Sequence, residues 1–154
     1  MKKLLFILML CPLMMVTSCK GNVDGGTKTD SKEAKELLID KDIEAANAQF
    51  PMQVDFATKV LSISRDGDDV IYHYEFEEDL VGVETLIEGR ETIKSELKKN
   101  ILDLLNRDSS FRNSMNLMKE TGKCMKYEYK GSKSGKTMVI EFTTDEISEL
   151  LGEE

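Results

Sequence analysis

The sequence predicts an α+β protein in which an antiparallel sheet of two hairpins, about four strands, is covered on one face by helices. Its elements are expected in the order α-ββ-αα-ββ-α. Two observations indicate this class: strand-like segments occur in pairs joined by short turns, and the segments around them carry apolar residues at helical spacing. Because the strands come as hairpins and not as strand–helix–strand units, the sheet is expected to be antiparallel.

The first half of this order is one helix followed by one hairpin. Ser31 is a good helix N-cap, and the helix after it should end at Phe50-Pro51, because a residue before proline avoids the α conformation. Residues 55–64 and 69–77 then have strand character, and in the second segment Val70, Tyr72, Tyr74 and Phe76 alternate onto one face. Asp66-Gly67 between them is typical of a hairpin turn.

Two helices and a second hairpin follow. The apolar residues from Ile93 to Leu105 form one helical stripe, and a second helix starts at Asp108 or Ser109 and ends at Gly122. Residues 124–130 and 137–143 alternate as strands, and a last helix starts at Thr143 with a capping box. Each hairpin contains a Tyr-x-Tyr pair, which indicates either a weak duplication or simply β propensity.

The N-terminus has the organisation of a bacterial lipoprotein signal. Met1-Lys2-Lys3 is a short basic region, and the apolar run up to Val16 is too short to span a bilayer, which takes about 20 residues. Val16-Thr17-Ser18-Cys19 resembles a lipobox, in which the cysteine thiol receives a diacylglyceryl group before cleavage on its N-terminal side. The alternative is a plain secretory signal that leaves Cys19 as a free thiol.

This interpretation divides the chain into a signal peptide (1–18), a lipidated flexible tether (19–30) and one globular domain (31–154). Residues 1–18 contain two lysines and no acidic residue, so their removal changes the formal charge from −8 to −10. Such an acidic chain gains nothing from counterion release on nucleic acid, which excludes that class of partner. In the best-known Gram-negative sorting rule, an Asp directly after the lipidated cysteine retains a lipoprotein at the inner membrane. This chain has Lys20 at that position, so resemblance to that system favours the outer membrane.

The residues with catalytic potential are few. His73 is the only histidine, and Cys124 is the only cysteine outside the signal and the lipobox, so a Cys124/His73 pair is the one thiol site available. The segment 131–137 looks like a phosphate-binding loop, but it has only three residues between its glycines and a strand after it, so we interpret it as a hairpin turn.

The acidic clusters offer only weak sites. Asp66, Asp68 and Asp69 lack the spacing of a calcium-binding loop, and we interpret them as solvated turn residues. Glu75 and Glu77 share a predicted strand face, as a glycosidase pair would, but the sequence has no Trp for a sugar platform. We therefore expect no catalytic residue, no metal and no cofactor.

Beyond its signal, the chain resembles the small uncharacterised α+β lipoproteins of Bacteroidota-type genomes. The resemblance rests on Asn47-x-x-Phe50-Pro51, on Tyr72-His73-Tyr74, and on Gly122-Lys123-x-Met125-x-Tyr127-x-Tyr129 before a glycine turn. It implies a fold and a location in the cell envelope, and it transfers no catalytic residue.

The sequence thus predicts a lipid-anchored envelope protein that is not an enzyme and whose domain binds another protein or a small ligand, as an adaptor or an inhibitor does. The protein is expected to attach to the membrane through lipid on Cys19. The alternative hypothesis is a small envelope hydrolase or thiol enzyme that uses Cys124 and His73.

Overall fold

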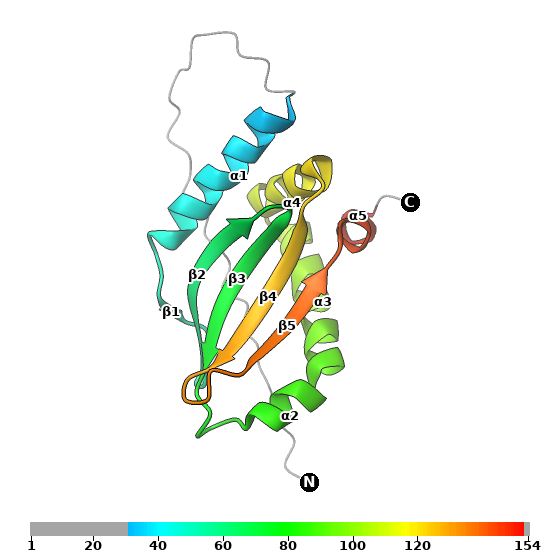
Figure 1. The fold of residues 1–154 in the computed structure, drawn as a ribbon. Coiled ribbons are helices and arrows are strands. Elements are labelled where there is room, and N and C mark those ends of the chain that lie inside the picture. Colours follow the sequence, from blue (N-terminus) through cyan, green and yellow to red (C-terminus); the bar gives the residue numbers. More distant parts are fainter. Residues whose placement is uncertain (1–30, 153–154) are drawn as a thin grey trace.

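The computed structural model describes residues 31–152, which form a five-stranded sheet with helices against one face (Figure 1). The predicted signal peptide, Cys19 and the predicted tether lie outside the described residues. The elements, in chain order, are α1 (Lys32–Asn47), β1 (Met52–Gln53), β2 (Thr58–Asp66), β3 (Asp69–Phe76), α2 (Val83–Glu88), α3 (Arg90–Arg107), α4 (Ser109–Thr121), β4 (Cys124–Gly131), β5 (Thr137–Phe142) and α5 (Thr144–Leu151).

The sheet has the order β1-β2-β3-β4-β5, and its central pair is parallel. The prediction of a wholly antiparallel sheet of four strands was therefore wrong in two respects. β1 adds a fifth strand, which is only two residues long and too short to show alternation. The chain leaves the end of β3, passes through α2, α3 and α4, and returns to the opposite end of the sheet, so β4 enters beside β3 in the same direction. The predicted element order also lacked β1 and the short α2.

Four predicted helix caps agree with the structure, but α1 ends at Asn47, before the predicted end at Phe50-Pro51. The side chain of Ser31 accepts a hydrogen bond from the Ala34 amide at the start of α1, and Asp108 caps α4. Thr143 and Glu146 form the capping box of α5. Gly122 ends α4 with φ = 72°, in the left-handed region where an L side chain would be strained. These local signals are strong because each one satisfies backbone groups that a helix end leaves unpaired.

The core lies between the helices and one face of the sheet. Alternate residues of β3, β4 and β5 point into it, and the other face of the sheet, the open face, carries polar side chains. Leu97 and Ile101 of α3 are completely buried, as the predicted apolar stripe of that helix requires. The buried hydrophobic residues of the four longer strands are Val60, Ile63, Val70, Tyr74, Phe76, Met125, Tyr127, Tyr129, Met138, Ile140 and Phe142.

All four tyrosines of the chain meet at the parallel joint of β3 and β4. Tyr72 stacks on Tyr127, and Tyr74 stacks on Tyr129, each pair with ring centroids 5.0 Å apart. These are also direct partners in the strand register. The two Tyr-x-Tyr pairs therefore form one aromatic ladder across the joint, which stabilises the pairing of strands that are distant in the chain.

The outer edge of β2 is closed by a side chain. The Asn47 amide at the end of α1 donates to the carbonyl of Ile63 at 2.8 Å and accepts from the Ile63 amide at 2.7 Å. It therefore satisfies both backbone groups of one edge residue, as a neighbouring strand would. The ladder of β2 with β3 is irregular between Val60 and Ser62, and β1 pairs with β2 only before this point. The Asn47 side chain covers the edge of β2 beyond it.

Charged residues hold α1 against the ends of the strands. Arg65 on β2 binds Asp40 with two hydrogen bonds of 2.7 and 2.8 Å. Lys123, just before β4, has a side chain that is only 2% exposed and binds Glu36 and Asp68, both at 2.9 Å. Among residues 31–152, no helix is both long enough and apolar enough to cross a membrane.

Candidate functional site

The helix-covered face of the sheet has a small apolar pocket between α1 and α4. Its free volume is about 30 Å³, which is enough for the tip of one aliphatic side chain. The walls come from four elements: α1, α4, β2 and β3. The lining residues are Ile39, Asp42, Ile43, Ile63, Val70, Tyr72, Ser114 and Met118.

The polar groups of this pocket come from α1, α4 and β3. The Ser114 hydroxyl donates to the Asp42 carboxylate at 2.9 Å, which links α4 to α1. Burial, with a smaller contribution from the Asp42 charge, raises the pKa of Tyr72 to about 12, so this phenol stays neutral at physiological pH. The pocket thus combines an apolar lining with a few fixed polar groups, which is the usual composition of a binding site.

On the open face, three side chains from three neighbouring strands form a hydrogen-bonded row. The Ser64 hydroxyl on β2 lies 2.7 Å from Nε2 of His73 on β3. Nδ1 of the same ring lies 3.0 Å from Oε1 of Glu128 on β4. The sequence pointed to His73 but not to its two neighbours, because Glu128 becomes adjacent to His73 only through the parallel pairing of β3 with β4.

The structure does not bring His73 and Cys124 together. Cys124 pairs with Asp69 at the start of β4, whereas His73 pairs with Glu128 four residues further along. At about 3.3 Å per residue, this offset separates the two positions by about 13 Å. A thiol–imidazole pair needs hydrogen-bond distance, so the hypothesis of a Cys124/His73 enzyme is wrong for this fold.

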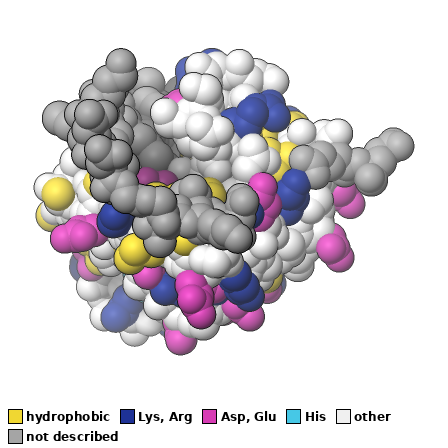
Figure 2. Space-filling model, turned by 90° about the horizontal axis from the view of Figure 1, so that it is seen from above, with side chains coloured by type: hydrophobic (Ala, Val, Ile, Leu, Met, Phe, Trp, Pro, Cys, Tyr) yellow, Lys and Arg dark blue, Asp and Glu magenta, His cyan; other side chains and the backbone are white. Residues whose placement is uncertain are grey.

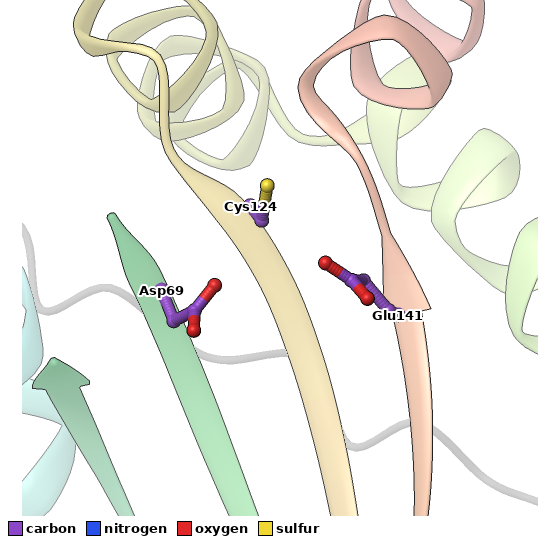
Figure 3. Close-up of side chains that lie close together, drawn as sticks. All are labelled: Asp69, Cys124 and Glu141. Atoms are coloured by element: carbon purple, nitrogen blue, oxygen red, sulfur yellow. The ribbon is translucent and has the colours of Figure 1, made fainter. Parts of the chain in front are cut away.

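Cys124 lies instead beside two carboxylates, as Figure 3 shows. Ligand atoms of Asp69, Cys124 and Glu141, from three adjacent strands, lie within 4.8 Å of one another. Lys126 already binds Asp69 at 2.6 Å. The hydrogen bond to Asp69 and the charges of Asp69 and Glu141 outweigh burial and raise the pKa of Lys126. A metal ion would therefore have to displace this ammonium from Asp69.

The loop that looks like a phosphate-binding loop is the turn of the β4–β5 hairpin, as predicted. It does bind an anion, which is the carboxylate of Glu78. Glu78 accepts from the Ser134 amide at 2.8 Å and from the Ser134 hydroxyl at 2.7 Å, and these bonds lower its pKa. A Cβ on Gly131 would lie 1.8 Å from Glu78 Oε1, so a glycine is needed there for this approach.

The acidic clusters are largely neutralised by lysines of the same chain. Asp68 binds Lys123 and Asp69 binds Lys126. Glu75 and Glu77, which could have formed a glycosidase-type carboxylate pair, bind different partners. Glu75 binds Lys59 at 2.6 Å, whereas Glu77 lies beyond the end of β3 and accepts a hydrogen bond from Ser132. In Figure 2, acidic and basic side chains are accordingly interspersed, with hydrophobic atoms between them.

Comparison with known proteins shows a similarity of fold and no match by sequence. No family model matches the sequence, and no curated protein matches it. Among solved structures, a protein assigned as secreted in Pseudomonas aeruginosa matches with a TM-score of 0.59 and 12% identity, over 80% of this chain and 99% of the other. The pilotin EpsS of the Vibrio vulnificus type 2 secretion system matches with a TM-score of 0.52 and 16% identity, over 75% of this chain and 94% of EpsS.

The pilotin AspS of the Vibrio cholerae type II secretion system matches similarly, with a TM-score of 0.51, 12% identity, and coverage of 75% and 94%. The chain has the fold of these pilotins. At this identity the likeness concerns the fold alone.

Proposed function

We propose that this protein is a lipid-anchored adaptor of the cell envelope, held at the outer membrane through Cys19, whose domain binds an apolar segment of another envelope protein in the pocket between α1 and α4. The observation that carries the proposal is this pocket, because it combines aliphatic side chains around a small free volume with a few fixed polar groups.

The contacts around the pocket suit it to receive a side chain. Its two helical walls are fixed in position, since Asp42 binds Ser114 near the middle of α1 and Lys35 binds Glu120 nearer its start, at 2.8 Å. A site held open by such contacts loses little conformational entropy when it is filled. The likeness in fold to two pilotins supports the same class of function, because both belong to type 2 secretion systems.

Replacing Ile43 with asparagine should weaken partner binding by at least about tenfold, because it puts an amide in place of an aliphatic wall of the pocket. Ile71→Asn is the matched control: Ile71 is also a half-buried isoleucine, but it points to the open face of β3. Detergent extracts of the native envelope would be passed over each immobilised variant, and the protein retained by the wild type would be quantified.

The expected result is one envelope protein that the wild type and Ile71→Asn retain and Ile43→Asn loses, with all three proteins folded by circular dichroism. Equal retention by both variants would place the binding surface elsewhere. A protein that Ile71→Asn loses while Ile43→Asn retains it would assign the surface to the open face.

Replacing Cys19 with alanine in the full-length chain should move the protein from the membrane fraction to the soluble fraction. Several acyl chains on one residue anchor a protein stably, since each buried methylene contributes about 0.8 kcal/mol, and a chain without them has no such anchor. Fractionation of cells, with mass spectrometry of the mature N-terminus, measures this. A Cys19→Ala protein that still sediments with the membranes would contradict the anchor.

A further inference from the structure

We propose that Ser64 is an activated nucleophile that takes up an acyl group from activated esters, with His73 as its base and Glu128 as the group that orients the imidazole. The three side chains lie on neighbouring strands of the open face, on the other side of the sheet from the pocket. The contacts that carry the proposal are the 2.7 Å separation of Ser64 Oγ from His73 Nε2 and the 3.0 Å separation of His73 Nδ1 from Glu128 Oε1.

The direction of these hydrogen bonds follows from Glu128. An ionised carboxylate only accepts hydrogen bonds, so Nδ1 of His73 must carry the proton that it shares with Glu128. In the neutral imidazole, Nε2 is then the free acceptor, and the Ser64 hydroxyl donates to it. This is the tautomer in which a histidine can remove the serine proton, and it is the arrangement by which serine nucleophiles are activated on unrelated folds.

The backbone holds this geometry in place. Ser64, His73 and Glu128 belong to three consecutive strands, whose registers are fixed by the ladders of β2 with β3 and of β3 with β4. Sites built on strands are more exact than sites built on loops. The side chains of His73 and Glu128 remain 29% and 34% exposed, so an electrophile can approach the row from solvent.

The same backbone limits the chemistry. The Ile63 amide binds the Asn47 side chain, and the backbone amides of a strand lie in the plane of the sheet, so the amides near Ser64 do not point above it where an oxyanion would form. Losing one oxyanion donor costs a serine enzyme about 10²–10³ in kcat, so only electrophiles with a good leaving group should react at a useful rate. The second step, attack of water on the acyl-serine, has no such leaving group and should be slow.

The step balances without another reactant. The Ser64 oxygen forms a bond to the acyl carbon while its proton passes to His73 Nε2. The bond from that carbon to the leaving oxygen then breaks, and the leaving alkoxide or phenoxide takes the proton from His73. The acyl-serine remains, and its slow hydrolysis consumes one water and returns the free hydroxyl. A fluorophosphonate reacts in the same way at phosphorus, with fluoride as the leaving group.

The test is labelling of the full-length, detergent-solubilised protein with an alkyl fluorophosphonate, followed by peptide mapping. Labelling at Ser64 is expected, with loss in Ser64→Ala and a rate at least about tenfold lower in His73→Asn and in Glu128→Gln. Ser62→Ala is the matched control, because Ser62 is on the same strand and faces His73 in the register but does not take part in the row. Its rate should equal that of the wild type.

Three results would overturn the proposal: no adduct on Ser64, an adduct whose rate is unchanged in His73→Asn, or equal labelling of the protein after unfolding in urea. Thermal unfolding of each variant separates loss of reactivity from loss of fold, since these partly exposed side chains should shift the midpoint little. The pocket variant Ile43→Asn should label at the wild-type rate, so failure here and failure of the proposed adaptor function are distinguishable.

Discussion

Replacing Leu97 with alanine should lower the free energy of unfolding by about 2–5 kcal/mol, which is a large part of the stability of a domain of this size. Leu97 is in the middle of α3, the longest helix, and its side chain is 0% exposed. The substitution removes buried methylenes and leaves a cavity that the surrounding sheet and helices can fill only in part. Urea unfolding followed by circular dichroism measures the loss.

Leu102→Ala is the matched control for this prediction. Leu102 belongs to the same helix but is 38% exposed, so its truncation should change the free energy of unfolding by less than about 0.5 kcal/mol. A Leu97→Ala protein that is as stable as the Leu102→Ala protein would mean that α3 does not pack on the sheet as described.

Replacing Lys123 with alanine should lower the free energy of unfolding by about 2–4 kcal/mol. All three ammonium donors of this buried lysine are used, by Glu36 and Asp68 at 2.9 Å and by the Gly67 carbonyl at 3.0 Å. Alanine removes these bonds and the packing of the aliphatic stem. Because Glu36 and Asp68 are partly exposed, water can replace their lost partner, and the effect stays below that of a fully buried ion pair.

Lys123→Met separates the two contributions, because methionine keeps most of the stem and lacks the charge. Burial opposes the charge of Lys123, but its bonds to Glu36 and Asp68 raise its pKa overall. The same bonds, Lys123 being the main cause, lower the pKa values of Glu36 and Asp68 in the folded protein.

A lowered carboxyl pKa contributes stability that is complete above the ordinary value of about 4 and is lost as the pH falls through the lowered value. The difference in unfolding free energy between wild type and Lys123→Met should therefore be constant near pH 7 and shrink below about pH 4. A difference that grows on acidification would contradict this role of Lys123.

The sequence was sufficient for most of the elements, though not for β1 and α2, and it was not sufficient for their arrangement. Periodicity and caps located α1, α3, α4, α5 and both hairpins, because these signals act between residues close in the chain. The parallel pairing of β3 with β4 depends on where three helices return the chain, and no local pattern encodes that. The two-residue β1 lies below the length at which alternation can be recognised.

The candidate sites were harder to predict for the same reason. His73 and Cys124 attracted attention because each is a rare reactive residue, but their separation depends on the register of β3 and β4. Ser64 and Glu128 are common residue types with no distinctive spacing, and they become neighbours of His73 only in the folded sheet. The pocket likewise combines α1 and α4, which the sequence gives no reason to place side by side.

The aromatic ladder gives the protein an optical signal of its own. The chain has no Trp, and its four tyrosines all lie at the joint of β3 and β4, so the intrinsic fluorescence comes entirely from this joint. The paired residues of β3 and β4 are 55 positions apart in the chain, whereas the two strands within each hairpin follow one another directly. Because joining segments so far apart is the slow part of folding, a stopped-flow tyrosine trace should report the closure of the sheet, whereas circular dichroism reports the earlier helices.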